Sequence, residues 1–309
     1  MKVLLMDLDI NRRRRPFPNL ALMKLSAFHK VRGDQVFLNS PLFCKPDILY
    51  ASCVFSWNAR MRATVAPGTI VGGSGLDLKA ELPPEVEHIM PDYSLYPGVD
   101  SSMGFTSRGC IRKCKWCIVP EKEGVIRPVA RIYEFWDRRH RRIILFDNNL
   151  LASPNWRQTM EDLIVEDLEV DFNQGLDIRL VNEENVGYLK RVKARQFRFG
   201  KKGRKTLRFA FDDIAYEGAV RRGIELLLDA GIGSRSLSFY ALQGFGDDNT
   251  AVERVNILRS FNVDIYPMAY KGADGKGPKR KLLYHGTDLW HGPRRNISKF
   301  LRLVGRLPE

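Results

Sequence analysis

The sequence predicts an α/β protein in three parts: a small parallel-sheet unit at 1–90, a partial barrel of strand–helix repeats at 91–272, and a basic extension at 273–309. Three observations predict this organisation. Short apolar runs alternate with segments of helical periodicity, as in proteins with parallel sheets. A stretch at 91–98 that contains two prolines and a glycine separates two such series. From Lys271 onward, the sequence contains ten Lys or Arg residues but only three Asp or Glu.

The first unit contains four apolar runs and one helical segment. Strands are expected at 2–8, 35–39, 47–55 and 69–73. The segment 19–30 carries Leu20, Met23, Ala27 and Phe28 close to helical spacing, and Gly33 ends it. The sequence Gly-Gly-Ser-Gly at 72–75 indicates a tight turn. Strands that alternate with helical or looping segments predict a Rossmann-like parallel sheet.

The second unit contains six strands that alternate with five helices, which corresponds to a (β/α)6 partial TIM barrel. The strands are expected at 103–107, 142–146, 170–173, 206–211, 236–242 and 263–268. The helices are expected at 129–138, 154–163, 182–193, 216–230 and 250–260. Ser153 and Asn182 are expected to cap the second and third helices, with Pro154 at the first position of the second.

Composition and charge limit the classes of function. The 309 residues carry 50 Lys or Arg and 36 Asp or Glu, a net charge of +14, which makes nucleic acid a candidate partner. The sequence contains no run of eighteen apolar residues, so no membrane span is predicted. Two acids within the first nine residues favour a strand over a secretory signal. Five cysteines without such a signal indicate a reducing compartment, so a cytoplasmic location is expected.

The most informative stretch is Cys110-x3-Cys114-x2-Cys117, with Trp116 before the third cysteine. Three thiolates on one short loop can hold three corners of a cubane iron–sulfur cluster, and the fourth iron then stays open to an exogenous molecule. A structural zinc site would need a fourth ligand, and no second Cys or Cys/His pair follows at the usual spacing. A thioredoxin-like pair of Cys114 and Cys117 would leave Cys110 without a role.

This cysteine loop resembles that of the radical S-adenosylmethionine (SAM) superfamily. The resemblance implies a partial TIM barrel over about residues 92–272, with a [4Fe–4S] cluster held by Cys110, Cys114 and Cys117. It also implies that the cluster passes an electron to SAM and yields a 5′-deoxyadenosyl radical. An electron donor of the flavodoxin or ferredoxin type is expected. The run Cys117-Ile118-Val119-Pro120, with Gly124 and Arg127 downstream, is similar to methylthiotransferases in particular.

Reactive groups of parallel barrels gather at the carboxyl ends of the strands, and here those ends are rich in acids and amides. The resemblance places SAM beside them. The expected contacts are Trp116, Asp147, Asn148, Asn149, Gln174, Asp177, Asp212, Tyr240, Gln243, Gly244 and Met268. Arg108 and Arg179 either pair with the SAM carboxylate or form ion pairs within the protein. The alternative for the polar residues is that they are helix caps and turn residues. The catalytic residues and the substrate stay unknown.

The first unit loosely resembles the cobalamin-binding domain that precedes many radical SAM barrels. The Asp-x-His-x-x-Gly motif of that domain is absent, since Asp9-Ile10-Asn11 offers no histidine, so cobalamin is not expected. Cys44 and Cys53 are interpreted as small buried side chains and not as ligands of a second cluster. Two alternative functions stay open: a radical enzyme that modifies RNA or a nucleobase, and a nucleic-acid-binding protein with a structural metal.

Overall fold

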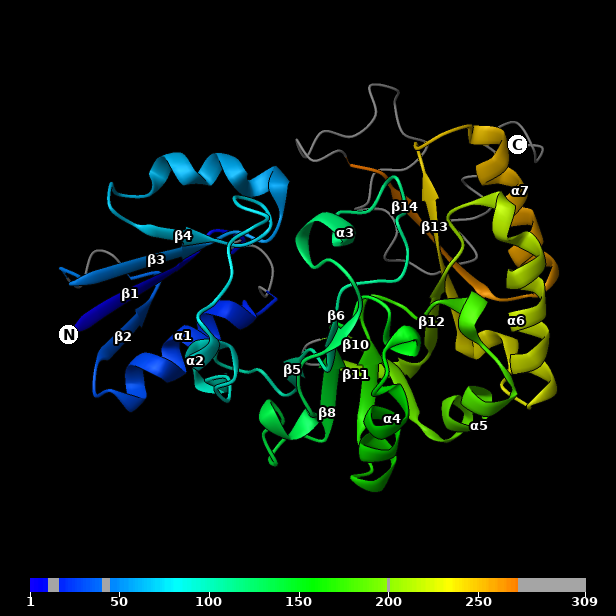
Figure 1. Cartoon of the computed structure of the whole chain (residues 1–309), viewed down its shortest axis with the longest axis horizontal. Coiled ribbons are helices and arrows are strands. Elements are labelled where there is room, and N and C mark those ends of the chain that lie inside the picture. Colours follow the sequence, from blue (N-terminus) through cyan, green and yellow to red (C-terminus); the bar gives the residue numbers. More distant parts are fainter. Residues whose placement is uncertain (11–16, 41–44, 199–200, 272–309) are drawn as a thin grey trace.

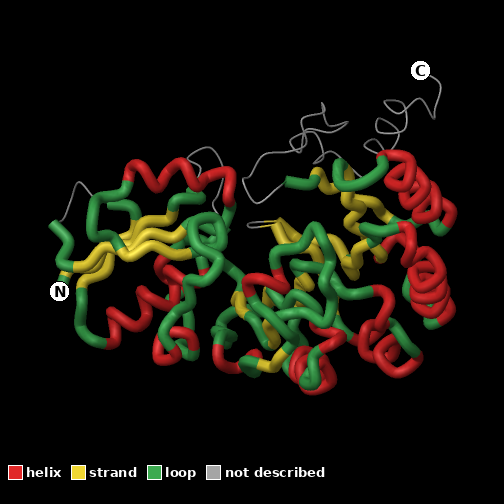
Figure 2. The backbone as a smooth tube through the Cα atoms, turned by 45° about the horizontal axis from the view of Figure 1, so that its top comes forward, coloured by secondary structure: helices red, strands yellow, loops and turns green. Residues whose placement is uncertain are grey.

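The structure of the protein is a computed structural model that describes residues 1–10, 17–40, 45–198 and 201–271. The expected basic extension at 273–309 and Cys44 lie outside these residues. Two lobes stand side by side, a smaller one with the N-terminus and a larger one that holds all strands after residue 100 (Figures 1 and 2). Mixed α/β architecture with parallel sheets in both lobes confirms the predicted fold class.

The smaller lobe contains a four-stranded parallel sheet in the order β2-β1-β3-β4. Its strands are β1 (Lys2–Asp7), β2 (Gln35–Leu38), β3 (Ile48–Ser52) and β4 (Ile70–Gly72). Helix α1 (Leu20–Val31) covers one face, where Leu22 and Leu25 pack on Val3 and Leu5. The 3-10 segment η2 (Ser56–Thr64) lies on the other side (Figure 1). All four predicted strands and the predicted helix are therefore present.

The glycine turn after β4 is required by a close approach of the backbone. Gly73 has φ +90°, and a Cβ there would lie 2.3 Å from the Cys53 carbonyl oxygen. A Cβ on Gly75 would lie 2.7 Å from the Phe55 carbonyl carbon, so no larger residue fits without a backbone shift. These glycines let the chain fold over the end of β3, as the predicted tight turn requires.

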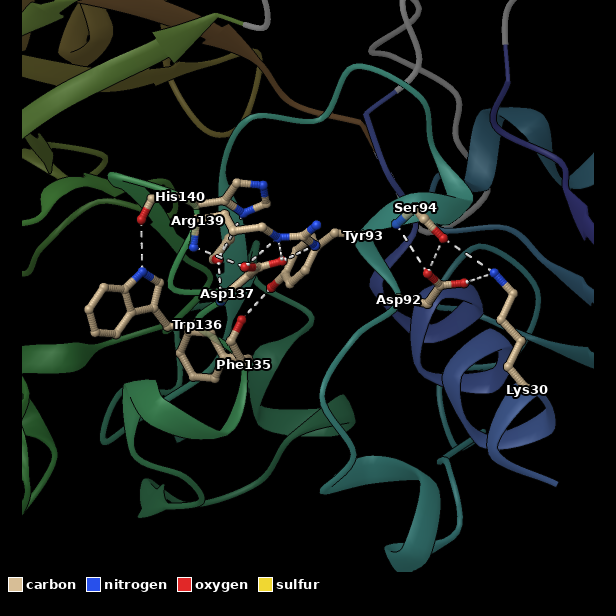
Figure 3. Close-up of polar contacts among 10 residues, drawn as sticks. Lys30, Asp92, Tyr93, Ser94, Phe135, Trp136, Asp137, Arg139 and His140 are labelled. Carbon is tan, nitrogen blue, oxygen red and sulfur yellow. Dashed lines mark hydrogen bonds and ion pairs between the residues drawn. The ribbon is translucent and has the colours of Figure 1, made fainter. Parts of the chain in front are cut away.

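Two consecutive linker residues are hydrogen-bonded to opposite lobes (Figure 3). The linker runs from α2 (Pro84–Glu87) through η3 (Tyr93–Leu95). Asp92 accepts hydrogen bonds from Lys30 Nζ at 2.7 Å and Ser26 Oγ at 2.6 Å, both on α1. Tyr93 Oη donates to the Phe135 carbonyl and accepts from Met103 N at 2.9 Å, both in the larger lobe. The linker thus fixes one lobe against the other.

The larger lobe contains all six predicted barrel strands. They are β5 (Ser102–Gly104), β8 (Arg142–Leu145), β9 (Glu169–Phe172), β12 (Leu207–Ala210), β13 (Leu237–Gln243) and β14 (Asp264–Ala269). The pairs β5–β8–β9 and β12–β13–β14 are parallel, and a single parallel bridge between Leu176 and Phe209 joins the two groups. The carboxyl ends of all six strands therefore face one side.

A hairpin that the sequence patterns did not predict extends the first group of strands. It consists of β10 (Lys193–Arg198), parallel to β9, and β11 (Lys201–Lys205), antiparallel to β10. Its many Lys and Arg residues are typical of a solvent-exposed loop. In the structure, however, Lys193 pairs with Asp167 at 2.5 Å and Arg195 pairs with Glu169 at 2.6 Å. Acids distant in sequence balance the charge of this strand.

Four helices cover the outer face of the larger lobe (Figure 1). They are α4 (Trp156–Val165), α5 (Glu183–Arg191), α6 (Glu217–Asp229) and α7 (Asp248–Ser260). Asn182 caps α5 as predicted, whereas Asn155 and not Ser153 precedes α4. One large apolar core lies between these helices and the strands. No helix in the described ranges is long and apolar enough to cross a membrane.

The predicted helix at 129–138 is wrong, because only the short 3-10 segment η4 (Ile132–Glu134) forms there. Ile132, Phe135 and Trp136 are buried as expected. Phe135 leaves the helical region at φ −133°, and its ring packs against Gly104, where a Cβ would lie 2.4 Å from the ring. Packing of this aromatic side chain on β5 ends the helix after one turn.

Candidate functional site

The cysteine loop is closed at its base by a two-stranded ribbon. Strands β6 (Ser107–Arg108) and β7 (Arg127–Pro128) pair antiparallel on either side of it, and α3 (Val119–Lys122) follows the third cysteine. Gly109 has φ +84°, and a Cβ there would lie 2.2 Å from the Val125 carbonyl oxygen. Cys110 N donates to the Gly124 carbonyl at 3.1 Å. The start and end of the loop therefore touch directly.

The loop is fixed to the barrel by Asp147, which directly follows Phe146 at the end of β8. The Asp147 carboxylate accepts from Thr106 N at 3.1 Å, Thr106 Oγ1 at 2.7 Å, Ser107 N at 2.6 Å and Ser107 Oγ at 2.6 Å. Its side chain is buried, and burial raises the pKa of its carboxyl group despite these hydrogen bonds. The residue expected to contact SAM here holds the approach to the first cysteine.

The three cysteines of the loop are free thiols. Cys110 and Cys114 are half-buried and Cys117 is exposed. Burial raises the pKa of the Cys114 and Cys117 thiols, and the neighbouring cysteines raise it further. Within the described residues, no three His, Cys, Asp or Glu side chains are close enough together to hold a metal ion. Cys117 N donates to the Cys114 carbonyl at 3.0 Å, so the second and third cysteines share one turn of the loop.

Asn149 connects the first cysteine to the next strand end. Its Nδ2 donates to Cys110 Sγ at 3.4 Å and to Asp177 Oδ2 at 3.3 Å. Asp177 also accepts from Arg112 Nε at 3.1 Å and from Arg179 Nε at 2.6 Å. Burial would raise the pKa of Asp177, but these two guanidinium groups bring it below its ordinary value. An ionised carboxylate thus orders two arginines beside the cysteines, and Arg112 was not foreseen.

Asp212 and Gln243 lie at the ends of β12 and β13, which a buried arginine holds together. Arg254 of α7 donates to the Phe211 and Leu242 carbonyls, both at 2.7 Å. Asp212 Oδ1 accepts from Leu242 N at 2.9 Å, and burial raises the pKa of its carboxyl group. Arg254 is fully buried on a helix that the sequence marks only by its apolar positions, so no sequence signal indicated this role.

Several side-chain atoms at the strand ends are buried without a partner among the described residues. They are Asn148 Nδ2, Asn149 Oδ1 and Gln243 Nε2. An unpaired buried polar atom costs about 1–3 kcal/mol, so such atoms commonly mark a place where a ligand or water binds. All three belong to residues expected to contact SAM.

The remaining expected contacts differ in position. Trp116 packs edge-to-face on Phe245 at 5.5 Å between ring centroids, which brings the loop to the end of β13. Gly244 lies in the same turn, with φ +78°. Tyr240 Oη donates to the Asn173 carbonyl at 3.3 Å inside the barrel, farther back along β13. Gln174 and Met268 are exposed at their strand ends.

The two arginines with alternative roles form ion pairs within the protein. Arg108 contacts Glu87 at 2.8 Å and Glu123 at 3.1 Å, and its guanidinium lies 4.1 Å above the ring of Phe105. Arg179 pairs with Asp177 and lies 4.2 Å above the ring of Tyr216. The ion-pair interpretation describes both side chains.

The sequence matches no protein-family model and no curated protein. Among solved structures, the fold is similar to that of TsrM from Kitasatospora setae, a radical S-adenosylmethionine methyltransferase with cobalamin and a [4Fe-4S] cluster bound. The similarity has a TM-score of 0.60 at 11% sequence identity and covers 86% of this chain and 74% of that one. At this identity the comparison concerns the fold alone, and it shows that the two lobes together share the overall fold of that structure.

Proposed function

We propose that the protein is a radical SAM enzyme in which Cys110, Cys114 and Cys117 hold a [4Fe–4S] cluster. The observation that carries this proposal is the placement of the three-cysteine loop at the carboxyl ends of the barrel strands, fixed by Asp147 and contacted by Asn149. Parallel barrels carry their chemistry at this edge. When bound, the cluster supplies the electron for reductive cleavage of SAM.

The residues around the loop fit an amino-acid and nucleoside ligand. Asn149 Oδ1, an acceptor without a partner among the described residues, suits the SAM amino group, and Asn148 and Gln243 offer donors. The cluster of Arg112, Asp177 and Arg179 carries two positive charges against one negative charge beside the cysteines, which suits a carboxylate. Trp116 and Phe245 form an aromatic edge suitable for the adenine. Asp147 acts in this proposal as a positioning residue and not as a contact.

Cobalamin is not part of the proposal, although the similar structure contains it. The Asp9 carboxylate, in the stretch where the cobalamin motif would stand, accepts from Val54 N at 2.5 Å and Asn58 Nδ2 at 2.8 Å. The turn with Gly73 and Gly75 is filled by the backbone of Cys53 and Phe55. Both features serve the internal packing of the lobe. Visible absorbance of protein purified in the presence of hydroxocobalamin tests this point.

Anaerobic reconstitution tests the proposed function. We expect about four irons per chain and, on reduction with SAM, formation of 5′-deoxyadenosine. The variant Cys114→Ala should lose the visible absorption of the cluster, whereas Cys53→Ala, which changes a buried cysteine outside the loop, should retain it. One tightly held zinc without SAM cleavage would instead identify a binding protein with a structural metal.

Three further expectations belong to this proposal. Residues 1–90 and 91–272 act as two domains that meet at the linker. A flavodoxin- or ferredoxin-type donor supplies the electron. The protein works in a reducing compartment such as the cytoplasm, because exposed thiol ligands and an iron–sulfur cluster are sensitive to oxidation.

A further inference from the structure

An exposed pair of stacked aromatic rings lies directly after β3 in the smaller lobe. The rings of Phe55 and Trp57 are nearly parallel, with centroids 4.5 Å apart and an interplanar angle of 16°. Their exposed fractions are 41% and 45%, and Met61 in the same segment is 40% exposed. Flat rings of this size are usually covered in a folded protein, so their exposure indicates a contact surface.

The surroundings of this aromatic pair are basic. Arg60 and Arg62 on η2 are exposed, and Lys271 Nζ lies 3.8 Å from the centroid of the Trp57 ring. The sequence contains no Asp or Glu between Asp47 and Asp77. Asp9, from outside this segment, does adjoin the pair, but its carboxylate accepts hydrogen bonds from Val54 N, Phe55 N and Asn58 Nδ2. Three cations and two aromatic rings beside this engaged carboxylate favour a ligand that is both planar and anionic.

Side-chain contacts link this surface to the cysteine loop. Tyr270, next to Lys271, packs on Phe245 at 5.0 Å, and its N donates to the Gln243 carbonyl at 2.8 Å. Phe245 in turn packs on Trp116, the neighbour of Cys117. On the other side of the loop, Lys122 Nζ of α3 donates to the Leu78 carbonyl of the smaller lobe at 3.4 Å. The aromatic pair therefore lies at the border of the proposed catalytic site, where the end of β3 faces α3 (Figure 1).

Phe55 covers one face of the Trp57 ring and Lys271 Nζ lies over the other, so the face of this pair that stays open for stacking is the outer face of Phe55. We propose that single-stranded nucleic acid binds here, with a base stacked on Phe55 and phosphates contacted by Arg60, Arg62 and Lys271. Stacking on aromatic side chains combined with cationic contacts to the backbone is how proteins bind single strands. The net charge of +14 favours a polyanion over a free nucleotide. This inference rests on the proposed function in naming the substrate class, but the binding itself requires neither cluster nor SAM.

Fluorescence anisotropy with a labelled single-stranded RNA of about twelve nucleotides and its DNA equivalent tests the proposal. We expect saturable binding that weakens with salt, as counterion release requires. Phe55→Leu should weaken it about tenfold, while Phe55→Tyr should retain most of it, because a stacked base contributes on this scale and needs a ring. An apolar contact without stacking would not distinguish leucine from tyrosine in this way.

A charge-matched pair of variants separates local contacts from overall charge. Arg60→Gln with Arg62→Gln should reduce the slope of log affinity against log salt by about 1.4, the expectation for two phosphate contacts on a single strand. Arg138→Gln with Arg139→Gln removes the same charge from exposed positions before β8, at the opposite end of the strands, and should leave the slope unchanged.

Three results would overturn the proposal: equal effects of the two charge pairs, binding to a mononucleotide as tight as to the strand, or binding to anionic phosphatidylserine vesicles with none to the oligonucleotides. Circular dichroism of each variant confirms that it is folded. Because the binding assay needs no iron, absence of binding would contradict this inference without contradicting the proposed cleavage of SAM. Conversely, loss of SAM cleavage with intact strand binding would contradict the proposed function alone.

Discussion

Asn149 Nδ2 donates a hydrogen bond to the sulfur of Cys110 at 3.4 Å while the Oδ1 of the same amide has no partner among the described residues. The side chain therefore touches the first proposed cluster ligand on one side and offers a buried acceptor on the other. In the proposed function, this amide would contact a cluster ligand with its nitrogen and the SAM amino group with its oxygen.

Asn149→Ala should weaken iron retention about 10- to 100-fold, the usual effect of removing a group that orients a metal ligand. Iron remaining during competition with a chelator, monitored by visible absorption, measures this. Asn182→Ala, which removes the cap of α5 far along the chain from the loop, is the control. Equal iron loss in both variants would show that Asn149 contributes only to folding.

Gly109→Ala should disrupt the cysteine loop. A methyl group there would lie 2.2 Å from the Val125 carbonyl oxygen, at a residue with φ +84°. Gly124, at the other end of the loop, has φ +71°, but a methyl group there would meet nothing within 4 Å. Gly124→Ala therefore incurs only the conformational cost of about 1–2 kcal/mol. Urea unfolding should show a larger loss for Gly109→Ala by at least about 2 kcal/mol. Equal losses would contradict the close approach.

Asp147→Asn should lower the free energy of unfolding by about 2–4 kcal/mol, because an amide cannot accept from both backbone N–H groups of Thr106 and Ser107. Thr106→Val removes a single hydroxyl donor to the same carboxylate and should cost less. Both values come from urea titrations of the metal-free protein. If Asp147→Asn were as stable as the wild type, the carboxylate would not be the anchor of the loop.

Asp7 predicts a pH dependence of stability. Burial raises the pKa of its carboxyl group from an ordinary 3.8 to about 6, even though Tyr96 Oη donates to it at 2.7 Å. The folded state then holds the proton more tightly than the unfolded state, so the contribution of Asp7 to stability is greatest below pH 4 and is lost as the pH rises through 6.

The variant Asp7→Asn lacks this titration. Between pH 4 and pH 7 the wild type should lose about 2.4 kcal/mol of unfolding free energy relative to the variant. Denaturant titrations of both proteins across this pH range measure the difference in unfolding free energy. The contributions of the other carboxylates cancel because they are the same in both proteins. A constant difference between the two would show that Asp7 is not protonated in the folded state.

The fold was largely predictable because apolar runs bounded by turn residues mark buried parallel strands, and all six barrel strands lie where such runs occur. The β10–β11 hairpin was missed since Lys193 and Arg195 are balanced by Asp167 and Glu169, which lie more than twenty positions earlier. The prediction of a helix at 129–138 was wrong because Phe135 packs on Gly104, and no pattern in the neighbouring sequence indicates this contact.

The candidate site was likewise predictable from the sequence only in part. The spacing of Cys110, Cys114 and Cys117 is a local pattern and identified the loop from the sequence alone. The anchoring of the loop by Asp147 and the joining of two strand ends by Arg254 depend on side chains about 40 or more positions from some of their partners. The polar residues at the strand ends indicated the region of the candidate site, but not which of these side chains form hydrogen bonds within the protein.

Asp92 and Tyr93 are neighbours in the chain, and each is bonded to a different lobe. These hydrogen bonds restrain the position of one lobe relative to the other. In the function and binding proposed above, the distance between the exposed rings of the smaller lobe and the sulfurs of the larger one is therefore restrained before a substrate arrives, and it limits the length of molecule that can contact both.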